Sequence, residues 1–301
     1  MSFNIAELIT KYNEANITIK ENEPMSFHTS FKVGGPADIF AVPETIEDLC
    51  KAIKLAKTAD APVFILGKGS NILVLDTGIR GVVISTEKVS NISVDNNRMT
   101  CECGASLTYS AIVARDAGLA GLAFVYGIPG SVGGAVFMNA GAYGGQMSDV
   151  VVKTKYYDTL TDEVCECTEH NFGYRESIYK EHPERIVLSA EFELKEGNIE
   201  EIKAEMDDYM ERRRSKQPLE YPSAGSTFKR YPGHFTGQLI EECGLKGVRV
   251  GGAEVSEKHA GFIINRDNAT SEDILGLIQF VKAEIKKKYG FEIECEVITV
   301  G

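Results

Sequence analysis

Apolar residues recur at helical spacing in several long stretches of the chain. Near the C-terminus, Ile274, Ile278, Val281 and Ile285 follow an i, i+4, i+7, i+11 pattern, and Gly290 comes after them. This spacing places the four side chains on one face of a helix, and a glycine just past the last apolar residue is a common helix end. The pattern therefore predicts a helix with one buried face. The same reasoning predicts an amphipathic helix at the N-terminus and helices over residues 45–59, 107–117, 199–216, 235–243 and 271–289.

Short runs rich in valine and isoleucine lie between the helical stretches. Such runs, bounded by turn residues, are typical of β-strands, and they occupy residues 38–42, 63–66 and 81–85. Because helices and strands are interspersed, we expect an α+β fold. A segment with two prolines at 217–223 predicts the main domain boundary, and 301 residues suit about two domains of ~150 residues each.

The acidic composition limits the partners. Asp and Glu number 44 against 32 Lys and Arg, so the net charge is −12, which disfavours binding to nucleic acid or to an anionic membrane. No apolar stretch approaches the ~20 residues that span a bilayer, and the N-terminal stretch has the pattern of an amphipathic helix instead of a signal peptide. We therefore expect a cytoplasmic protein with a small-molecule substrate, without nucleic acid, membrane insertion or an obligatory protein partner.

The seven cysteines do not suggest a metal site. Cys101 and Cys103, like Cys165 and Cys167, are separated by one residue, whereas zinc and redox pairs typically have two or more residues between the cysteines. Reduced and mostly buried thiols are the better interpretation. No metal is expected.

Two glycine-rich segments carry the strongest chemical signal. Residues 121–145 hold eight of the 29 glycines, and residues 66–74 read LGKGSNILV after an apolar run. Glycine allows positive φ and close approach of the backbone to a ligand, so both segments can present amides to a nucleotide diphosphate. The dinucleotide fingerprint and the P-loop both fail, because Ile72 and Pro62 stand where a glycine is needed. For either segment alone, a glycine-rich turn between packed layers is the alternative.

Six ordered motifs extend this signal from about residue 28 to the C-terminus. They read HTSFKVGGPAD (28–38), GKGSNILVLDTGIRGVVI (67–84), GIPGSVGGAVFMNAGAYGG (127–145), YRES (174–177), SAGSTFKR (223–230) and GLKGVRVGGAEVSEKHAGFIIN (244–265). With these motifs the sequence resembles the UDP-N-acetylenolpyruvoylglucosamine reductases, flavoenzymes of bacterial cell-wall synthesis, and looks like their shorter subclass. The resemblance implies an FAD-binding domain of the vanillyl-alcohol-oxidase (PCMH) type, made of two α+β subdomains at 1–90 and 91–216. It also implies a C-terminal α+β substrate domain at 217–301, whose last strand returns to the active site.

The resemblance further implies the cofactors and the reaction. FAD would be bound without a covalent link, and NADPH would donate the hydride. The enzyme would reduce the enolpyruvyl ether of UDP-N-acetyl-3-O-(1-carboxyvinyl)-glucosamine to UDP-N-acetylmuramate in peptidoglycan synthesis. The residues expected to bind the cofactor lie in the two glycine-rich segments and are Gly67, Lys68, Gly69, Ser70, Asn71, Gly127, Ile128, Pro129, Gly130, Ser131, Gly133, Gly134, Asn139 and Gly141.

Three residues match the family's catalytic positions. Hydride addition to the terminal enol carbon leaves negative charge on the adjacent carbon and its carboxylate, so the site must stabilise a dianion and then protonate it. Arg175 would bind the carboxylate, Glu296 would donate to the carboxylate or enolate oxygen, and Ser226 would give its proton to the carbon. Their structural alternatives are an ion-pair partner, a strand carboxylate and a turn residue, respectively. Glu294 competes with Glu296, because only Cys295 separates them, but the β-branched residue that follows favours Glu296.

Basic residues are dense in the last quarter of the chain, where an anionic substrate would need them. We expect Lys229 and Arg230, with Asn265, to contact the substrate, although Tyr231 stands where relatives more often have a proline. About half of the basic residues there are expected to be solvated surface charge, as are the three arginines at 212–214, which complement a helix dipole. The other basic residues of this region are Lys246, Arg249, Lys258, His259 and Arg266.

Two other functions fit part of the sequence. An oxidase or dehydrogenase of the same FAD fold, acting on alcohols or hydroxy acids, would explain the glycine-rich segments. It would not explain the three catalytic residues together with SAGSTFKR. A non-catalytic nucleotide-binding module has no need for this extended motif set, so we expect the reductase.

Overall fold

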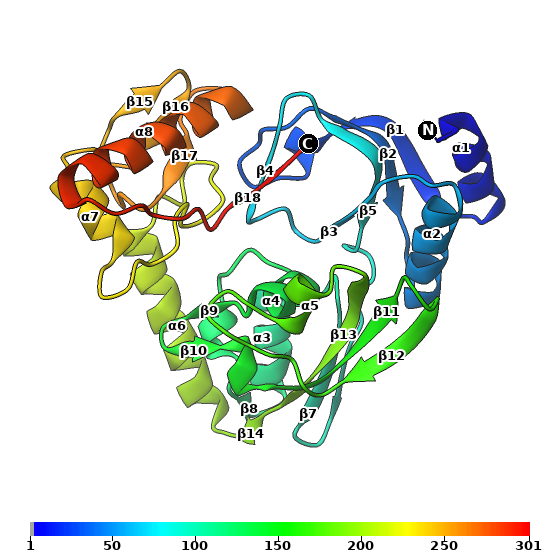
Figure 1. Ribbon diagram of the computed structural model, residues 1–301. Helices are drawn as coiled ribbons and strands as arrows, with labels where there is room; N and C mark the ends of the chain where they lie inside the picture. Colours follow the sequence, from blue (N-terminus) through cyan, green and yellow to red (C-terminus); the bar gives the residue numbers. More distant parts are fainter. Residues whose placement is uncertain (1–2) are drawn as a thin grey trace. The chain divides into compact units, whose positions relative to one another are not determined.

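The computed structural model describes residues 3–301, which form two compact units (Figure 1). Within the described residues, unit 1 comprises 3–21, Ile39–Lys68 and Gly81–Arg213, and unit 2 comprises Asn22–Asp38, Gly69–Arg80 and Arg214–Gly301. Each unit combines segments that are far apart in the chain. In unit 2, Phe31, Val33 and Leu73 are buried together with apolar residues of the C-terminal part. The division into three consecutive parts near residues 90 and 216 stays a prediction.

Two helices pack against each other in the N-terminal part of unit 1. They are α1 (Ile5–Glu14) and α2 (Ile46–Thr58), and Thr45 caps α2 as its position before the helix predicts. The hydroxyl of Tyr12 on α1 donates to the Ala52 carbonyl of α2 (2.9 Å). Both helices thus bury their apolar faces, as the amphipathic pattern requires.

The first sheet of the chain has four strands in the order β1-β2-β5-β3. Its inner pair is apolar, and β3 runs parallel to β5 with Val63 opposite Val82. The strands are β1 (Thr18–Pro24), β2 (Pro36–Val42), β3 (Val63–Leu66) and β5 (Ile79–Ser85).

A second, antiparallel sheet forms the centre of unit 1, in the order β12-β11-β13-β7-β6. Helices α4 and α5 pack on β13, the middle strand (Figure 1). The strands are β6 (Ile92–Asp95), β7 (Arg98–Glu102), β11 (Val151–Asp158), β12 (Glu163–Cys167) and β13 (Arg185–Glu193). The other elements of this part are α3 (Leu107–Asp116), β8 (Leu119–Ala120), η2 (Ala123–Val125), α4 (Val132–Met138), β9 (Gly141–Ala142), β10 (Gly145–Gln146), η3 (Met147–Asp149), α5 (Ile178–Glu181), β14 (Lys195–Glu196) and α6 (Ile199–Lys216).

Unit 2 is built around α8 (Ser271–Tyr289), which packs on the three-stranded sheet β15-β16-β17. Thr270 and Asp273 form a capping box at its start, and Gly290 ends it with a φ of 80°. The predicted apolar stripe of α8 is buried. A parallel pair, β4 with β18, ties the C-terminus to the segment 69–80. The remaining elements are η1 (Met25–Phe27), β4 (Ile72–Val74), α7 (Thr236–Glu242), β15 (Arg249–Val250), β16 (Ala253–Val255), β17 (Ile263–Asn265) and β18 (Ile298–Val300).

The predicted helices and strands are present with ends shifted by at most two residues, and the mixed α+β class is confirmed. β3 and β4 lie on either side of the glycine-rich segment around Gly67, but these two strands do not pair with each other. β3 pairs with β5, and β4 pairs with β18. Among residues 3–301, no helix is both long and apolar enough to cross a bilayer.

The cysteines are all free thiols, as predicted. The prediction that they are mostly buried was wrong, because only Cys101 and Cys103 are buried and the other five are half-buried. In the part of the chain that the structure describes, no group of three or more His, Cys, Asp or Glu side chains is placed to hold a metal ion.

Candidate functional site

The glycine-rich segment of unit 1 surrounds the start of α4, and its glycines are required by close packing. A Cβ at Gly133 would lie 2.9 Å from the Cβ of Cys103, and one at Gly130 would lie 3.0 Å from Leu107. The two glycine-rich segments meet at Gly67, where a Cβ would lie 2.3 Å from Ser131 Oγ. Such distances exclude any side chain without a shift of the surrounding atoms.

The backbone amides of these segments fall into two groups. The first three amides of α4, at residues 132–134, donate to protein oxygens. In contrast, the amides of residues 68–70 and 130–131 have no hydrogen-bond partner within residues 3–301. Amides in glycine-rich loops that the protein leaves unpaired suit an anionic ligand. Each of these two short stretches, and not the helix start itself, therefore leaves backbone amides for an anionic ligand.

Arg175 lies in a tight turn of unit 1. Two backbone hydrogen bonds between Gly173 and Glu176 close the turn (3.1 and 3.3 Å), and Arg175 has a φ of 60°. This left-handed conformation is unfavourable for a residue with a Cβ. Backbone strain of this kind persists only where the surrounding structure holds it, and it is frequent at functional sites.

Side chains hold the Arg175 turn from outside. The Lys180 ammonium donates to the Arg175 carbonyl (2.8 Å), and Ser177 Oγ donates to the Phe137 carbonyl on α4 (2.7 Å). Asn139 Nδ2 donates to the Gly173 carbonyl (2.9 Å), while its Oδ1 accepts from the Ser148 amide (3.0 Å). The Asn139 side chain, expected to bind the cofactor, is thus occupied by the protein, and a cofactor contact there would come from the backbone.

In unit 2, backbone pairing brings the extended segments that carry Ser226 and Glu296 side by side. The Glu296 amide donates to the Thr227 carbonyl (2.9 Å), and Phe228 forms a bridge with Cys295. Ser226 is exposed and the adjacent Thr227 is fully buried. Residues far apart in the sequence therefore place a hydroxyl and a carboxylate in one region of unit 2.

Asn71, which was predicted for the cofactor, joins this region. Its side-chain amide donates to the Glu296 carbonyl (3.2 Å), and its own carbonyl accepts from the Ile298 amide (3.0 Å). Asn71 thus supports the extended segment that carries Glu296.

The competing carboxylate has a different environment. Glu294 is exposed and pairs with the Lys229 ammonium (2.9 Å), and this hydrogen bond holds the pKa of Glu294 below its ordinary value. An exposed carboxylate stabilised as an anion is a poor proton donor. This environment disfavours Glu294 for a role that needs a protonated acid.

The residues expected to contact the substrate are partly engaged in the protein. Lys229 pairs with Glu294, and the guanidinium of Arg230 lies over the Phe235 ring (5.2 Å). Asn265 is buried: its side chain donates to the Phe31 carbonyl (3.0 Å) and accepts from the Ala269 amide (2.8 Å). The Asn265 side chain is a structural bridge within unit 2.

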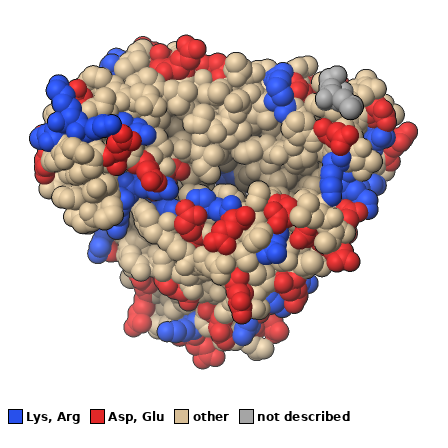
Figure 2. Space-filling model, viewed as in Figure 1, with Lys and Arg blue, Asp and Glu red and all other residues tan. Residues whose placement is uncertain are grey.

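Most of the other basic side chains of the last quarter have acidic neighbours. Lys246 pairs with Glu241 (2.6 Å) and Lys258 with Glu220 (3.6 Å), and Glu254 lies between Arg249 and Arg266. On the face shown in Figure 2, basic and acidic side chains likewise lie next to one another. This agrees with the expected surface charge.

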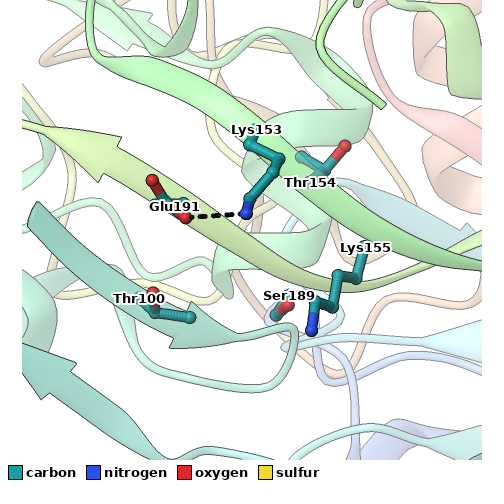
Figure 3. A pocket seen from close by; sticks show the side chains of 6 residues that line it. All are labelled: Thr100, Lys153, Thr154, Lys155, Ser189 and Glu191. Atoms are coloured by element: carbon teal, nitrogen blue, oxygen red, sulfur yellow. Dashed lines mark ion pairs between the residues drawn. The ribbon is translucent and has the colours of Figure 1, made fainter. Parts of the chain in front are cut away.

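A cavity of about 130 Å³ opens on the five-stranded sheet, but no predicted site residue lines it (Figure 3). The Lys153 ammonium inside it pairs with Glu191 (3.2 Å), and Lys155 lies 3.9 Å from Glu166. Its charges are therefore matched by the protein. The lining residues are Thr100, Lys153, Thr154, Lys155, Ser189 and Glu191.

Sequence reasoning missed Arg213. All three arginines at 212–214 were expected on a solvent face, but Arg213 is half-buried, and a Cβ at Gly127 would lie 3.3 Å from its Cδ. Burial lowers the pKa of its guanidinium. Arg213 thus places a cation beside the second glycine-rich segment. Nothing in the sequence separates it from its neighbours, because helix packing decides which of three consecutive arginines turns inward.

Known proteins match this chain over nearly its whole length. A family model described as the FAD binding domain matches residues 37–168, and one described as the C-terminal domain of UDP-N-acetylenolpyruvoylglucosamine reductase matches residues 217–300. The UDP-N-acetylenolpyruvoylglucosamine reductase of Caldanaerobacter subterraneus subsp. tengcongensis is 50% identical over 281 residues, which are 93% of each chain. That of Syntrophomonas wolfei subsp. wolfei is 51% identical over 288 residues, 94% of this chain and 95% of its own.

Comparison with solved structures agrees with the comparison of sequences. The crystal structure of UDP-N-acetylenolpyruvylglucosamine reductase (MurB) from Thermus caldophilus superposes with a TM-score of 0.79 at 33% identity, covering 95% of this chain and 99% of that one. Alkyldihydroxyacetonephosphate synthase has a TM-score of 0.50 at 15% identity, over 64% of this chain and 41% of its own. The second likeness is one of fold alone.

Proposed function

Because the chain belongs to the UDP-N-acetylenolpyruvoylglucosamine reductase family of FAD-dependent oxidoreductases, we propose that it reduces an enolpyruvyl ether of UDP-N-acetylglucosamine with NADPH. The product would be UDP-N-acetylmuramate, a precursor of peptidoglycan. The observation that carries the proposal is the backbone pairing in unit 2 that brings the extended segments of Ser226 and Glu296 side by side. Because both substrates are soluble nucleotides, we propose that the enzyme works in the cytoplasm.

The expected FAD-binding fold of the vanillyl-alcohol-oxidase type is confirmed. The residues that would hold FAD are those of the two glycine-rich segments, where the amides of residues 68–70 and 130–131 are unpaired within residues 3–301. When bound and reduced, FAD supplies the hydride. The protein must then deal with the charge that hydride addition creates.

Each catalytic residue has one task in this proposal. Hydride addition to the terminal carbon moves the double-bond electrons onto the adjacent carbon and its carboxylate. Arg175, a permanent cation with a planar fork, binds that carboxylate. Glu296, protonated, donates to the carboxylate oxygen that gains charge. Ser226 transfers its hydroxyl proton to the carbanionic carbon, and water restores that proton.

Arg175 belongs to unit 1, and Ser226 and Glu296 belong to unit 2. Support for Glu296 over Glu294 comes from the Lys229 ion pair, which lowers the pKa of Glu294 and so favours its ionised form. Support for Arg175 comes from its strained turn, which several side chains hold.

The test is anaerobic flavin spectroscopy of the purified protein. NADPH is expected to bleach the FAD absorbance, and the enolpyruvyl sugar nucleotide is expected to restore it. The Arg175→Lys variant should be reduced normally by NADPH and reoxidised slowly, because lysine cannot form the two parallel hydrogen bonds. Oxygen uptake with an alcohol, without reoxidation by the sugar nucleotide, would indicate an oxidase. Protein without flavin would indicate a non-catalytic module.

A further inference from the structure

The segment that carries Arg175 is tied at both ends to one buried hydroxyl. Thr154 on β11 is only 1% exposed, and its Oγ1 lies 3.0 Å from His170 Nε2. The same oxygen is hydrogen-bonded to the Tyr179 hydroxyl. His170 precedes Arg175 in the chain and Tyr179 follows it, and the Ile178 amide donates to the His170 carbonyl (2.7 Å). Residues 170–178 therefore form a closed loop whose two ends meet at Thr154.

The Thr154 hydroxyl has three polar neighbours: His170 and Tyr179, at the two ends of the loop, and the Cys167 carbonyl at the longer distance of 3.5 Å. A threonine hydroxyl has one proton and two lone pairs, so it can donate to a neutral imidazole and accept from a tyrosine hydroxyl. Burial keeps the pKa of His170 below its ordinary value, so the ring is neutral at neutral pH. The Thr154 side chain points away from Lys153 and Lys155 in the cavity of Figure 3, into the protein. Loss of this hydroxyl would leave two buried polar side chains without their partner.

The loop needs such support because of the conformation at its tip. Arg175 is in the left-handed region, and Tyr174 beside it is half exposed. A strained turn on a partly solvated loop relaxes to other conformations unless its ends are fixed. The contacts from Asn139 and Lys180 act on the turn itself, whereas Thr154 acts on the loop's attachment to the sheet.

We infer that Thr154 is a positioning residue for the reaction: through His170 and Tyr179 it fixes both ends of the loop 170–178 and so holds Arg175 ready to bind the substrate carboxylate. This inference rests on the function proposed above for Arg175. It assigns a role in the reaction to a buried threonine on the central sheet and to a histidine outside the glycine-rich and YRES motifs.

The test compares two substitutions of one residue in the full-length, FAD-loaded enzyme. Thr154→Val keeps the shape and removes the hydroxyl, whereas Thr154→Ser keeps the hydroxyl. Thr100→Val, on β7 of the same sheet, is the matched control, because Thr100 lines the outer cavity and has no part in the cluster. Each variant is measured by stopped-flow flavin absorbance, in both half-reactions, and by hydrogen exchange of the amides at 173, 176 and 178.

We expect Thr154→Val to slow reoxidation by the enolpyruvyl substrate about 10- to 100-fold, since small misplacement of a binding group costs rate on this scale. Reduction by NADPH should stay within about twofold, because it does not use Arg175. The three amides should exchange about tenfold faster, as expected for a loosened local unit. Thr154→Ser should restore both readouts, and Thr100→Val should match wild type.

Several results would overturn the inference. These are unchanged amide exchange in Thr154→Val, equal slowing of both half-reactions, or a serine variant as impaired as valine. Faster exchange with normal reoxidation would also overturn it. If Thr154→Val does not fold, Tyr179→Phe removes one of the two ties and must show the same pattern in weaker form. Failure of the proposed function is seen separately, as normal reoxidation of Arg175→Lys.

Discussion

Arg175 in unit 1 and Glu296 in unit 2 are held by different kinds of contact. The turn of Arg175 is strained and depends on side chains, among them Asn139 and Lys180. Glu296 lies in an extended segment held mainly by backbone pairs: its amide donates to the Thr227 carbonyl, and the Ile298 amide donates to the Asn71 carbonyl. The Asn71 side chain adds one contact, to the Glu296 carbonyl.

This difference has a consequence for mutation. A hydrogen bond from a side chain is lost when that residue is substituted, whereas backbone pairing survives most substitutions. We therefore expect the Arg175 turn to be sensitive to residues around it. The extended segments that carry Ser226 and Glu296 should keep their geometry when these two side chains are substituted.

The largest effect is expected at Ser226, because substitution removes the proposed proton donor and leaves the backbone pairing around it unchanged. Ser226→Ala should slow flavin reoxidation by the enolpyruvyl substrate ~10²–10⁴-fold, the usual worth of a general acid. Reduction by NADPH should stay near normal, and Ser226→Cys should retain more activity than Ala, because a thiol can still donate. Stopped-flow absorbance measures both phases. Equal slowing of the two phases would instead assign Ser226 to the shape of the flavin pocket.

A second prediction tests the packing of the cofactor segments in unit 1. Gly67→Ala should lower the free energy of unfolding by about 1–3 kcal/mol, the usual cost of overpacking, and reduce FAD content. The cause is the clash with Ser131 Oγ, because the Ser131 Cβ would lie 3.5 Å from the added methyl group, which is an ordinary contact. Ser131→Ala alone should cost about 1 kcal/mol through the lost cap of α4. In the double variant the two losses should not add, and simple additivity in denaturant unfolding would contradict this explanation.

A third, smaller effect is expected from Asn139→Asp. The substitution keeps the acceptor for the Ser148 amide and a residue tolerant of the left-handed conformation, but it removes the donor to the Gly173 carbonyl. We expect a loss of about 1 kcal/mol in stability, with slower reoxidation and unchanged reduction by NADPH. Asn139→Asp with wild-type kinetics in both half-reactions would show that the Arg175 turn does not need this contact.

The smallest effect is expected at Glu294, and it sharpens the choice between the two carboxylates. Glu294→Gln breaks only an exposed ion pair with Lys229, so activity should stay within about twofold of wild type. Glu296→Gln, the matched variant, should impair reoxidation strongly, because the amide cannot act as a proton-donating acid. Reversed results for the two variants would move the catalytic role to Glu294.

The local elements of this protein could be predicted from the sequence because their causes are local. The apolar stripe of α8 follows from residue spacing, and its ends follow from Thr270 and Gly290. The glycine-rich and catalytic motifs likewise indicated FAD and the family, because that chemistry requires particular residue types in a particular order. These inferences needed no knowledge of which segments meet.

Tertiary structure alone decided which residues share an environment. β3 and β4 are neighbours in the sequence, yet each pairs with a different partner strand. The side chain of Asn265 is hydrogen-bonded within unit 2. Arg213 turns inward beside Gly127. Thr154, on β11, is hydrogen-bonded to residues at both ends of the loop that carries Arg175. The physical reason is that burial and hydrogen bonding depend on distances between residues far apart in the chain, which packing fixes and local spacing does not.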